Sequence, residues 1–337
     1  MKAGALPLGS RLLGEGQPCL VVAHVGTAHG GEPDLALRLI EAAFQGGADA
    51  IAFPVFRASE LLARRHPQRK ELEAAELSAR EWRKVLQAAK GSGLAVVAEA
   101  YDAASRDVAA EAGVDAFQTH PTDLDHPDLL RALAAAGRPL LVGASGAAEP
   151  HVGDALAAAG GSAALLLGLA TVPAAAEELR LAELAVIRER YRVPVGLLDP
   201  TDGGSAFALL APALAAAHGA DFVEKSLALD RTRKGREGAA ALPPEEFYRM
   251  VELLRQAERA RGDGESRGRV ASARGRSIVA AGLIARGEAI TAEKLVYKRT
   301  DERFERGLAP AEAHRVIGRR AARPIQADET IREDMLE

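Results

Sequence analysis

The sequence has little cysteine, little net charge and no long hydrophobic run, and each shortage excludes a class of protein. Cys19 is the only cysteine among 337 residues, so no disulfide can form within the chain, and its place at the start of an apolar run predicts a buried, reduced thiol. A formal net charge of -4, with acidic and basic residues interspersed, favours neither nucleic acid nor a membrane surface as a partner. No stretch reaches the roughly 20 apolar residues of a membrane span, and the N-terminus lacks the apolar core of a signal peptide. We therefore expect a cytoplasmic protein.

Eight short apolar runs alternate with amphipathic stretches that have a helical period. The runs begin at residues 19, 48, 94, 114, 138, 162, 193 and 220. Near-continuous apolar strands that alternate with helices indicate a parallel sheet buried on both faces. Eight such units over about 225 residues predict a (β/α)8 TIM barrel. A doubly wound open sheet is the alternative, and it is disfavoured because no G-x-G-x-x-G follows any of the strands.

A polar, glycine-rich segment, RGDGESRGRVASARG, follows the last helical stretch. Such composition is typical of an exposed linker. Beyond it the sequence predicts short strands and turns without the barrel period. We therefore predict a barrel over residues 1–258, a linker over 259–275 and a second, small domain over 276–337.

Five stretches, in the same order along the chain, resemble motifs of the sialic acid synthase family. They begin at Ala23 (AHVGTAHGG), Gly47 (GADAIAFPVFRA), Val193 (VPVGLLDPTDGG), Asp221 (DFVEKSLALDR) and Arg276 (RSIVAAGLIARGEAIT). Members of that family condense phosphoenolpyruvate with an N-acetylated sugar to give a nonulosonic acid. The resemblance covers nearly the whole chain, and it implies a TIM barrel followed by a small antifreeze-like (SAF) domain.

The resemblance also shows which functional side chains this sequence lacks. Two histidines hold the divalent metal of the family, and Pro200 and Ser226 stand at their positions. Proline cannot ligate a metal, and a lone serine hydroxyl is a poor substitute for imidazole. Ala52 and Gln118 stand at the positions of two phosphate-binding lysines, although phosphoenolpyruvate, with about three negative charges, requires several charge-assisted hydrogen bonds. We therefore predict no metal at the ligand positions of the family, no cofactor, and loss of the condensation activity.

Other side chains of the family motifs are present or have a substitute. Asp199, Thr201, Glu224 and Lys225 keep the residues of the family, and His29 stands at a histidine of the family. Glu237 stands where the family has aspartate, and Arg299 corresponds to an arginine that reaches the sugar site of the partner subunit. The predicted catalytic residues are His24, Glu99, Asp199 and Glu237. The predicted substrate-binding residues are His29, His120, Thr201, Glu224, Lys225 and Arg299.

His24, Glu99 and His120 could form a rebuilt site. Each is expected at or just past the C-terminal end of a strand, where barrels place their sites, and two imidazoles with one carboxylate are a common ligand set for a divalent metal. The alternative is a rim that has drifted to polar residues without purpose. Glu224 and Lys225, which are adjacent in the sequence, either form a structural ion pair that seals the barrel or take part in binding.

Two functions stay open at this point. The chain is either a sialic acid synthase-like binding or regulatory protein of glycan or nonulosonic acid biosynthesis, without the family's activity, or a divergent sugar-acid synthase or lyase with a rebuilt site at the barrel mouth. An amino sugar or a sugar acid is the expected ligand in both cases. The resemblance further implies a homodimer in which the SAF domain of each subunit covers the barrel mouth of its partner.

Overall fold

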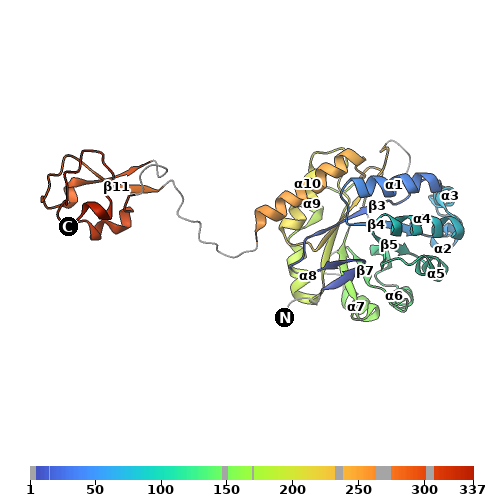
Figure 1. Ribbon diagram of the computed structural model, residues 1–337. Helices are drawn as coiled ribbons and strands as arrows, with labels where there is room; N and C mark the ends of the chain where they lie inside the picture. The colour runs from blue at the N-terminus through green and yellow to red at the C-terminus, as the bar shows by residue number, and fades with distance from the viewer. Residues whose placement is uncertain are drawn as a thin grey trace. The chain divides into compact units, whose positions relative to one another are not determined.

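The computed structural model describes residues 5–14, 16–145, 151–168, 171–231, 238–262, 275–300 and 307–337. The chain divides into two compact units, Met1–Gly262 and Asp263–Glu337 (Figure 1). The first unit holds the predicted barrel, and the second holds the predicted small domain.

Eight parallel strands close into a barrel in the order β10-β3-β4-β5-β6-β7-β8-β9. The strands are β3 (Leu20–His24), β4 (Ala50–Val55), β5 (Ala95–Ala100), β6 (Ala116–Gln118), β7 (Leu140–Ala144), β8 (Ala163–Leu167), β9 (Val195–Asp199) and β10 (Phe222–Ser226). Nearly all their residues are buried, because helices cover the outer face and side chains fill the inside. The closed order confirms the (β/α)8 barrel and excludes the open, doubly wound sheet.

Helices follow the strands and surround the barrel (Figure 1). They are α1 (Pro33–Gln45), α2 (Ala58–Leu61), α3 (Arg69–Ala75), α4 (Ala79–Gly91), α5 (Ala103–Glu111), α6 (Pro127–Ala134), α7 (Val152–Ala159), α8 (Glu183–Tyr191), α9 (Phe207–Ala217) and α10 (Pro244–Arg261), with the 3-10 helices η1 (Pro121–Asp123) and η2 (Ala176–Leu179). Local sequence explains some of their starts: Ser78 and Glu81 form a capping box at the start of α4, and this pair satisfies two backbone N–H groups. Among the described residues, none of the helices combines the length and the apolar character needed to cross a membrane.

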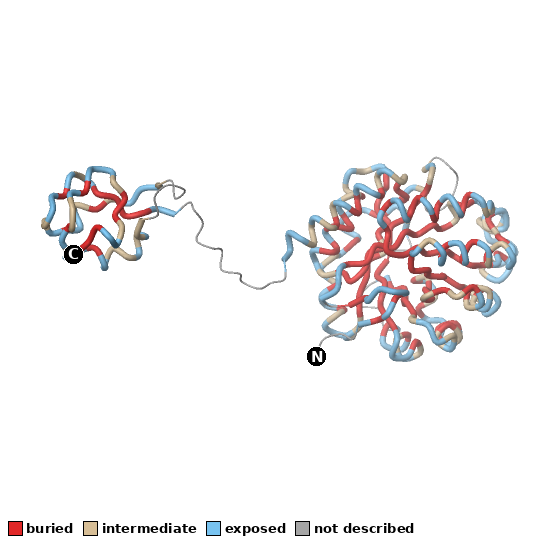
Figure 2. The backbone as a smooth tube through the Cα atoms, in the orientation of Figure 1, coloured by how far each residue is buried: buried red, intermediate tan, exposed pale blue. Residues whose placement is uncertain are grey.

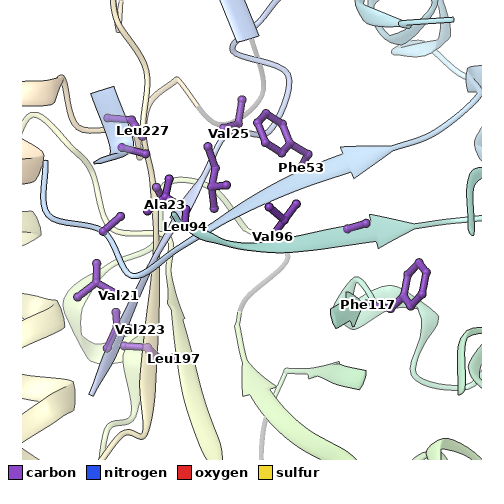
Figure 3. Packing of buried hydrophobic residues seen from close by; sticks show 14 of the residues in the cluster. Val21, Ala23, Val25, Phe53, Leu94, Val96, Phe117, Leu197, Val223 and Leu227 are labelled. Carbon is purple, nitrogen blue, oxygen red and sulfur yellow. The ribbon is translucent and has the colours of Figure 1, made fainter. Parts of the chain in front are cut away.

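Side chains that alternate along the strands form two separate apolar layers. Val21, Leu197 and Val223 are cross-strand partners and pack outward in the cluster that includes the helices (Figure 3). Val22 and Phe222 belong to the other cluster, which fills the inside of the barrel. Burial is therefore concentrated on the strands and on the helix faces that touch them (Figure 2).

Phe222 fills the centre of the barrel because the neighbouring strand offers glycine at the matching position. Gly196 pairs with Phe222 in the register of β9 and β10, and a Cβ atom at Gly196 would approach the Phe222 ring to 2.5 Å. A side chain at position 196 would therefore expel the ring, so glycine is needed there for close packing.

A short N-terminal hairpin, which the sequence analysis did not predict, closes one end of the barrel. Strands β1 (Leu6–Leu8) and β2 (Arg11–Leu13) pair antiparallel. The side chains of Leu6, Leu8 and Leu13 pack in the inner cluster together with the first residues of several barrel strands. The hairpin therefore plugs the N-terminal end of the barrel and leaves the C-terminal end for a ligand.

The small unit is built from short strands and turns, as the sequence indicates. Strands β11 (Arg276–Ala280) and β12 (Leu295–Arg299) pair antiparallel. The 3-10 helices η3 (Ala292–Lys294), η4 (Pro310–Arg315) and η5 (Glu333–Met335) complete the described part. An apolar core of its own includes Ile278, Ile290 and Ile325.

The linker predicted over residues 259–275 needs a correction at its start. Helix α10 continues to Arg261, so residues 259–261 are helical, because the sequence keeps good helix formers up to the glycine at 262. Residues 263–274 lie outside the described residues.

Removal of the hairpin plug should lower the free energy of unfolding. We expect Leu13→Ala to cost about 2–5 kcal/mol, the usual range for a buried leucine, because its side chain is fully buried in the inner cluster. Leu12→Ala is the matched control, since Leu12 is 48% exposed and its loss should change stability by less than about 0.5 kcal/mol. Urea denaturation measures both values, and equal values for the two variants would contradict the role of the hairpin.

Candidate functional site

A cavity opens at the C-terminal ends of the barrel strands. Its empty volume, which includes open solvent, is about 1000 Å³. Its lining includes His24 of β3, Glu99 of β5, Gln118 of β6, Asp199 of β9 and Ser226 of β10. In a (β/α)8 barrel this end carries the ligand site, because the loops after the strands converge there.

The alternation of side chains along each strand places polar groups directly above the inner apolar layer. His24 lies two residues after Val22, and Glu224 lies two residues after Phe222. Because residues two apart on a strand point to the same face, both polar side chains point into the barrel, as do the apolar residues before them. The cavity floor is therefore polar where the inner layer ends.

His24 lies between two carboxylates from different strands. Its Nε2 atom is 3.7 Å from Oε2 of Glu99 and 3.9 Å from Oε1 of Glu224. These distances are long for hydrogen bonds, so the interactions are mainly electrostatic. All three residues are buried. The structure thus brings together two of the predicted catalytic residues and one predicted substrate-binding residue.

Glu224 of β10 is held by an amide from β6, on the opposite side of the closed barrel. Nε2 of Gln118 donates a hydrogen bond of 3.0 Å to Oε1 of Glu224. Oε2 of Glu224 and Oε1 of Gln118 are buried and have no hydrogen-bond partner among the described residues. Both side chains line the cavity, so these two oxygens are available to hydrogen-bond donors of a ligand.

The two carboxylates differ in charge state because their surroundings differ. Burial raises the pKa of Glu99, but its interactions with His24, His120 and Tyr101 lower the pKa by more than burial raises it. The net pKa therefore lies below the ordinary value. Burial raises the pKa of Glu224, and the lowering effects of His24 and Gln118 do not offset this. Of the two, Glu99 therefore keeps its charge to lower pH, and Glu224 takes up a proton more readily.

His120 lies at the rim and caps a short 3-10 helix. Its Nδ1 accepts a hydrogen bond of 3.2 Å from the backbone N–H of Thr122 and lies 2.7 Å from the hydroxyl oxygen of Thr122. A neutral ring that accepts at Nδ1 carries its proton at Nε2. The ring also lines the cavity, so the structure brings His120 to the site as the sequence predicts.

The structure does not bring His29 into the cavity. Its side chain is fully buried and packs edge-on against Trp82 of α4, with ring centroids 5.4 Å apart. Its Nδ1 accepts a hydrogen bond from the backbone N–H of Gly31. His29, which was predicted to bind substrate, therefore packs against α4 and is not part of the described cavity lining.

Asp199, Thr201 and Lys225 form one buried network. Nζ of Lys225 is 2.9 Å from Oδ2 of Asp199 and donates to the backbone oxygen of Thr201 at 3.1 Å. Oδ1 of Asp199 accepts hydrogen bonds from the backbone N–H and the hydroxyl of Thr201. Lys225 is fully buried and is absent from the cavity lining. The network ties the loop after β9 to β10.

The alternative of a structural ion pair between Glu224 and Lys225 is wrong, because Lys225 pairs with a different carboxylate. Neighbouring residues of a strand point to opposite faces, so Glu224 points into the barrel and Lys225 points away from it. Lys225 instead pairs with Asp199. The ion pair exists, but it joins two strands and not two neighbours in the sequence.

The cavity does not reproduce the metal site of the sialic acid synthase family. Pro200 and Ser226 both line it, and proline offers no donor atom to a metal. Within the described ranges, no three His, Cys, Asp or Glu side chains are grouped so that they could hold a metal ion. The arrangement therefore lends no support to the rebuilt metal site of His24, Glu99 and His120, although His24 and Glu99 do meet.

The lining is acidic. Its ionisable members among the described residues are His24, Glu71, Glu99, Tyr101, His120, Asp199 and Glu224, and no lysine or arginine is among them. The counter-charge of Asp199 is already supplied by Lys225. A ligand in this cavity therefore meets carboxylates and imidazoles, with no fixed guanidinium or ammonium group in the lining that is described.

The described cavity lining does not include two further predicted site residues. Glu237 falls outside the described residues. Arg299 is the last residue of β12 in the small unit, and its side chain is exposed. Neither contributes to the described cavity lining.

Several lining residues were not predicted from the sequence, and most of these come from the segment after β4. Gln68 and Glu71, at the start of α3, line the cavity, as does Tyr101 just after β5. Tyr101 could have been found, because it directly follows an apolar strand. The long connection between β4 and α4 folds into two extra short helices, and strand periodicity cannot place such residues.

The buried ion pair should matter for folding far more than an exposed one. Lys225→Met leaves the carboxylate of Asp199 buried without its counter-charge, which typically costs about 3–5 kcal/mol. Arg131→Met is the control, since it breaks the exposed pair with Asp128 and should cost less than about 1 kcal/mol. Guanidinium denaturation measures both variants, and a loss below about 1 kcal/mol for Lys225→Met would show that the network does not hold the barrel.

Known proteins similar to this chain cover nearly its whole length. An uncharacterised protein of Methanocaldococcus jannaschii is 28% identical over 310 residues, which are 89% of this chain and 90% of that protein. The N,N'-diacetyllegionaminic acid synthase of Legionella pneumophila is 25% identical over 348 residues, 94% of each protein. The crystal structure of the N-acetylneuraminic acid synthetase of Leptospira borgpetersenii, with citrate, has a TM-score of 0.74 at 23% identity and covers 80% of this chain and 94% of that chain. That last similarity shows the fold.

Two family patterns match this chain, one for each unit. The pattern of the SAF domain matches residues 275–337, which include both strands of the small unit. The pattern of the NeuB family matches residues 39–266, well over half of the chain and most of the barrel. The chain therefore belongs to the NeuB family, a sialic acid synthase-like family of nonulosonic acid biosynthesis, and it carries a C-terminal SAF domain.

Proposed function

We propose that this chain binds an uncharged sugar or an amino sugar at its barrel mouth and does not condense it with phosphoenolpyruvate. It would act as a binding or regulatory protein in nonulosonic acid biosynthesis. One observation carries the proposal: the described lining of the cavity holds four carboxylates, two imidazoles and no lysine or arginine.

The charge of the lining opposes phosphoenolpyruvate. A unit charge about 4 Å from a like charge costs about 4 kcal/mol at an effective dielectric constant of about 20. Glu99 stays charged because its pKa is lowered, and no described cation of the lining offsets it. Gln118 offers an amide where the family has a phosphate-binding lysine, and that amide is already hydrogen-bonded to Glu224. In the described lining a trianion therefore meets no lysine or arginine for the charge-assisted bonds that it requires.

The same lining suits the hydroxyl and amide groups of a sugar. The buried oxygens of Glu224 and Gln118 without protein donors accept hydrogen bonds, and Glu99 and His120 add further polar atoms at the rim. Phe56 and Tyr101 supply aromatic surface to the same cavity. An acidic lining also favours a free amino group over a carboxylate or a phosphate.

A divergent sugar-acid synthase or lyase is the second candidate, and the approach of His24 to Glu99 favours it. Two ionisable groups in contact can move protons without a metal. Formation of pyruvate from a nonulosonic acid would support a lyase, and release of phosphate from phosphoenolpyruvate would support a synthase.

Titration calorimetry tests the proposal directly. We expect no heat of binding for phosphoenolpyruvate at millimolar concentration, with or without Mn²⁺, and no phosphate release when N-acetylmannosamine is added. Saturation-transfer NMR should detect binding of N-acetylmannosamine or mannosamine to the same protein. Metal-dependent binding of phosphoenolpyruvate, or phosphate release at an enzymatic rate, would refute the proposal.

A gain-of-function variant serves as the matched control for the metal. Pro200→His combined with Ser226→His places imidazoles at the two family positions, both of which line the cavity. If the cavity lacks only the two metal-ligating side chains, the double variant binds Mn²⁺ and the wild-type protein does not. Thermal unfolding of the variant checks that its fold is intact.

We further propose that the chain forms a homodimer in which Arg299 of one subunit reaches the barrel mouth of the other. Charge complementarity supports this arrangement, because the described cavity lining is acidic and lacks a cation. Arg299 is exposed at the end of β12, so its guanidinium group is accessible to a second subunit.

Light scattering should give twice the chain mass of 35.3 kDa. Arg299→Glu should weaken sugar binding to the dimer, because it replaces the only cation proposed to approach the cavity with an anion. Arg286→Glu, another exposed arginine of the small unit, is the control and should leave binding unchanged. A monomeric mass, or equal binding by both variants, would contradict the arrangement.

A further inference from the structure

We propose that His24, Glu99 and Glu224 form a metal-free acid–base site that moves the proton on the carbon next to the carbonyl group of an open-chain aldose bound at the barrel mouth. The inference rests on the proposed sugar binding at this cavity and adds a reaction to it. Neither the family pattern nor the similar proteins assign such a reaction.

His24 has the surroundings of a general base. Its side chain is 10% exposed, and Nε2 is 3.7 Å from Oε2 of Glu99. A carboxylate beside an imidazole stabilises the imidazolium ion that forms when the ring takes a proton. Glu99 is suited to this task because its interactions with His24 and His120 keep its pKa below the ordinary value despite burial. Glu99 therefore acts through His24 as a positioning residue.

Glu224 has the surroundings of a general acid. Its carboxyl group is fully buried, and burial raises its pKa. Gln118 donates to Oε1, while Oε2 has no hydrogen-bond partner among the described residues. Glu224 lines the cavity, so its carboxyl group, when protonated, can donate its proton to a ligand there. Two carboxyl groups with opposite pKa shifts in one site usually have separate tasks: here Glu224 is the acid, and Glu99 stays charged beside the base, His24.

The acid and the base are close enough to act on neighbouring atoms of one ligand. Nε2 of His24 is 3.9 Å from Oε1 of Glu224, and both side chains line the same cavity. A carbon–hydrogen bond can therefore face the imidazole while the adjacent carbonyl oxygen faces the carboxyl group. The three residues come from β3, β5 and β10, so rigid strands set these positions.

The proposed step balances without a further reactant. Nε2 of His24 takes the proton from C2 of the aldose, and the electron pair of that C–H bond forms the C1–C2 double bond of an enol. The carbonyl oxygen takes the proton of Glu224. The proton on His24 exchanges with solvent before the step reverses. Reversal then returns a proton from His24 to C2 and the hydroxyl proton of the enol to Glu224. For a 2-acylamino aldose, the net result is exchange of the C2 proton and, if the proton returns to the other face, inversion at C2.

Proton exchange in D₂O tests the inference. The full-length protein, treated with EDTA, is incubated with N-acetylmannosamine and separately with N-acetylglucosamine, and proton NMR follows the loss of the C2 hydrogen signal. We expect exchange above the buffer rate for at least one of the two sugars. His24→Asn and Glu224→Gln should lower the exchange rate by about 10²–10⁴-fold, the usual contribution of a general acid or base. His218→Asn, at an exposed helix end, is the matched control and should keep the rate.

Glu99 needs a readout that separates positioning from folding. Glu99→Gln should lower the exchange rate at saturating sugar while the dissociation constant of the sugar, measured by saturation-transfer NMR, stays within about twofold. Glu99→Asp keeps the charge and should restore part of the rate. A Glu99→Gln variant that exchanges at the wild-type rate would remove Glu99 from the site.

The outcomes distinguish this inference from the proposed function. Sugar binding without exchange overturns the acid–base site and leaves the binding function standing. Absence of both binding and exchange contradicts both proposals. Exchange that persists in His24→Asn, or that disappears on EDTA treatment, also overturns the inference, because the base or the metal independence would then be wrong.

Discussion

The alternation of side chains along buried parallel strands is the constraint on which the rest of this structure depends. Every second residue must fit inside a closed barrel, so the inner positions near the N-terminal end are apolar and one of them, Gly196, must be glycine to admit Phe222. At the C-terminal end the same positions carry His24, Glu99 and Glu224. Among the described residues these side chains interact with one another, with Gln118, and with His120 and Tyr101, and they line the cavity. The polar side chains of the cavity floor therefore occupy the same inward-facing strand positions as the apolar core, nearer the C-terminal end.

This polar layer explains how the barrel keeps its fold although the described part of the cavity lining holds no lysine or arginine. A charged carboxylate costs free energy when it is buried, and burial accordingly raises the pKa of Glu224 above its ordinary value. Glu99 remains charged because His24 and His120 compensate it. The cavity floor is thus internally balanced without lysine or arginine from the described lining. A ligand with several negative charges would disturb that balance, whereas a neutral sugar would only add hydrogen bonds.

The sequence predicts the barrel well because its eight apolar runs are long enough to identify without knowledge of their neighbours. It predicts the polar rim as a set, since each rim residue lies near the C-terminal end of a strand or just past it. It does not predict which residues meet. Lys225 pairs with Asp199 and not with Glu224, because the strand directs neighbours to opposite faces. His29 packs on Trp82 of α4 and does not line the cavity. Such contacts join residues that are far apart in the sequence, so local patterns do not reveal them. A three-residue strand such as β1 is missed for another reason, because it has too few residues for a periodic signal.

The residues that this chain shares with the sialic acid synthase motifs fall into two groups that differ in what they contact. Asp199, Thr201 and Lys225 form one buried network that joins β9, its following loop and β10, and loss of any one would leave a buried polar group without its partner. The requirements of folding alone are enough to retain them. Glu224 shares the motif with them but points into the cavity, where a neutral amide of the same shape would satisfy Gln118 equally well. A carboxyl group at that position is therefore explained by chemistry on a ligand better than by stability.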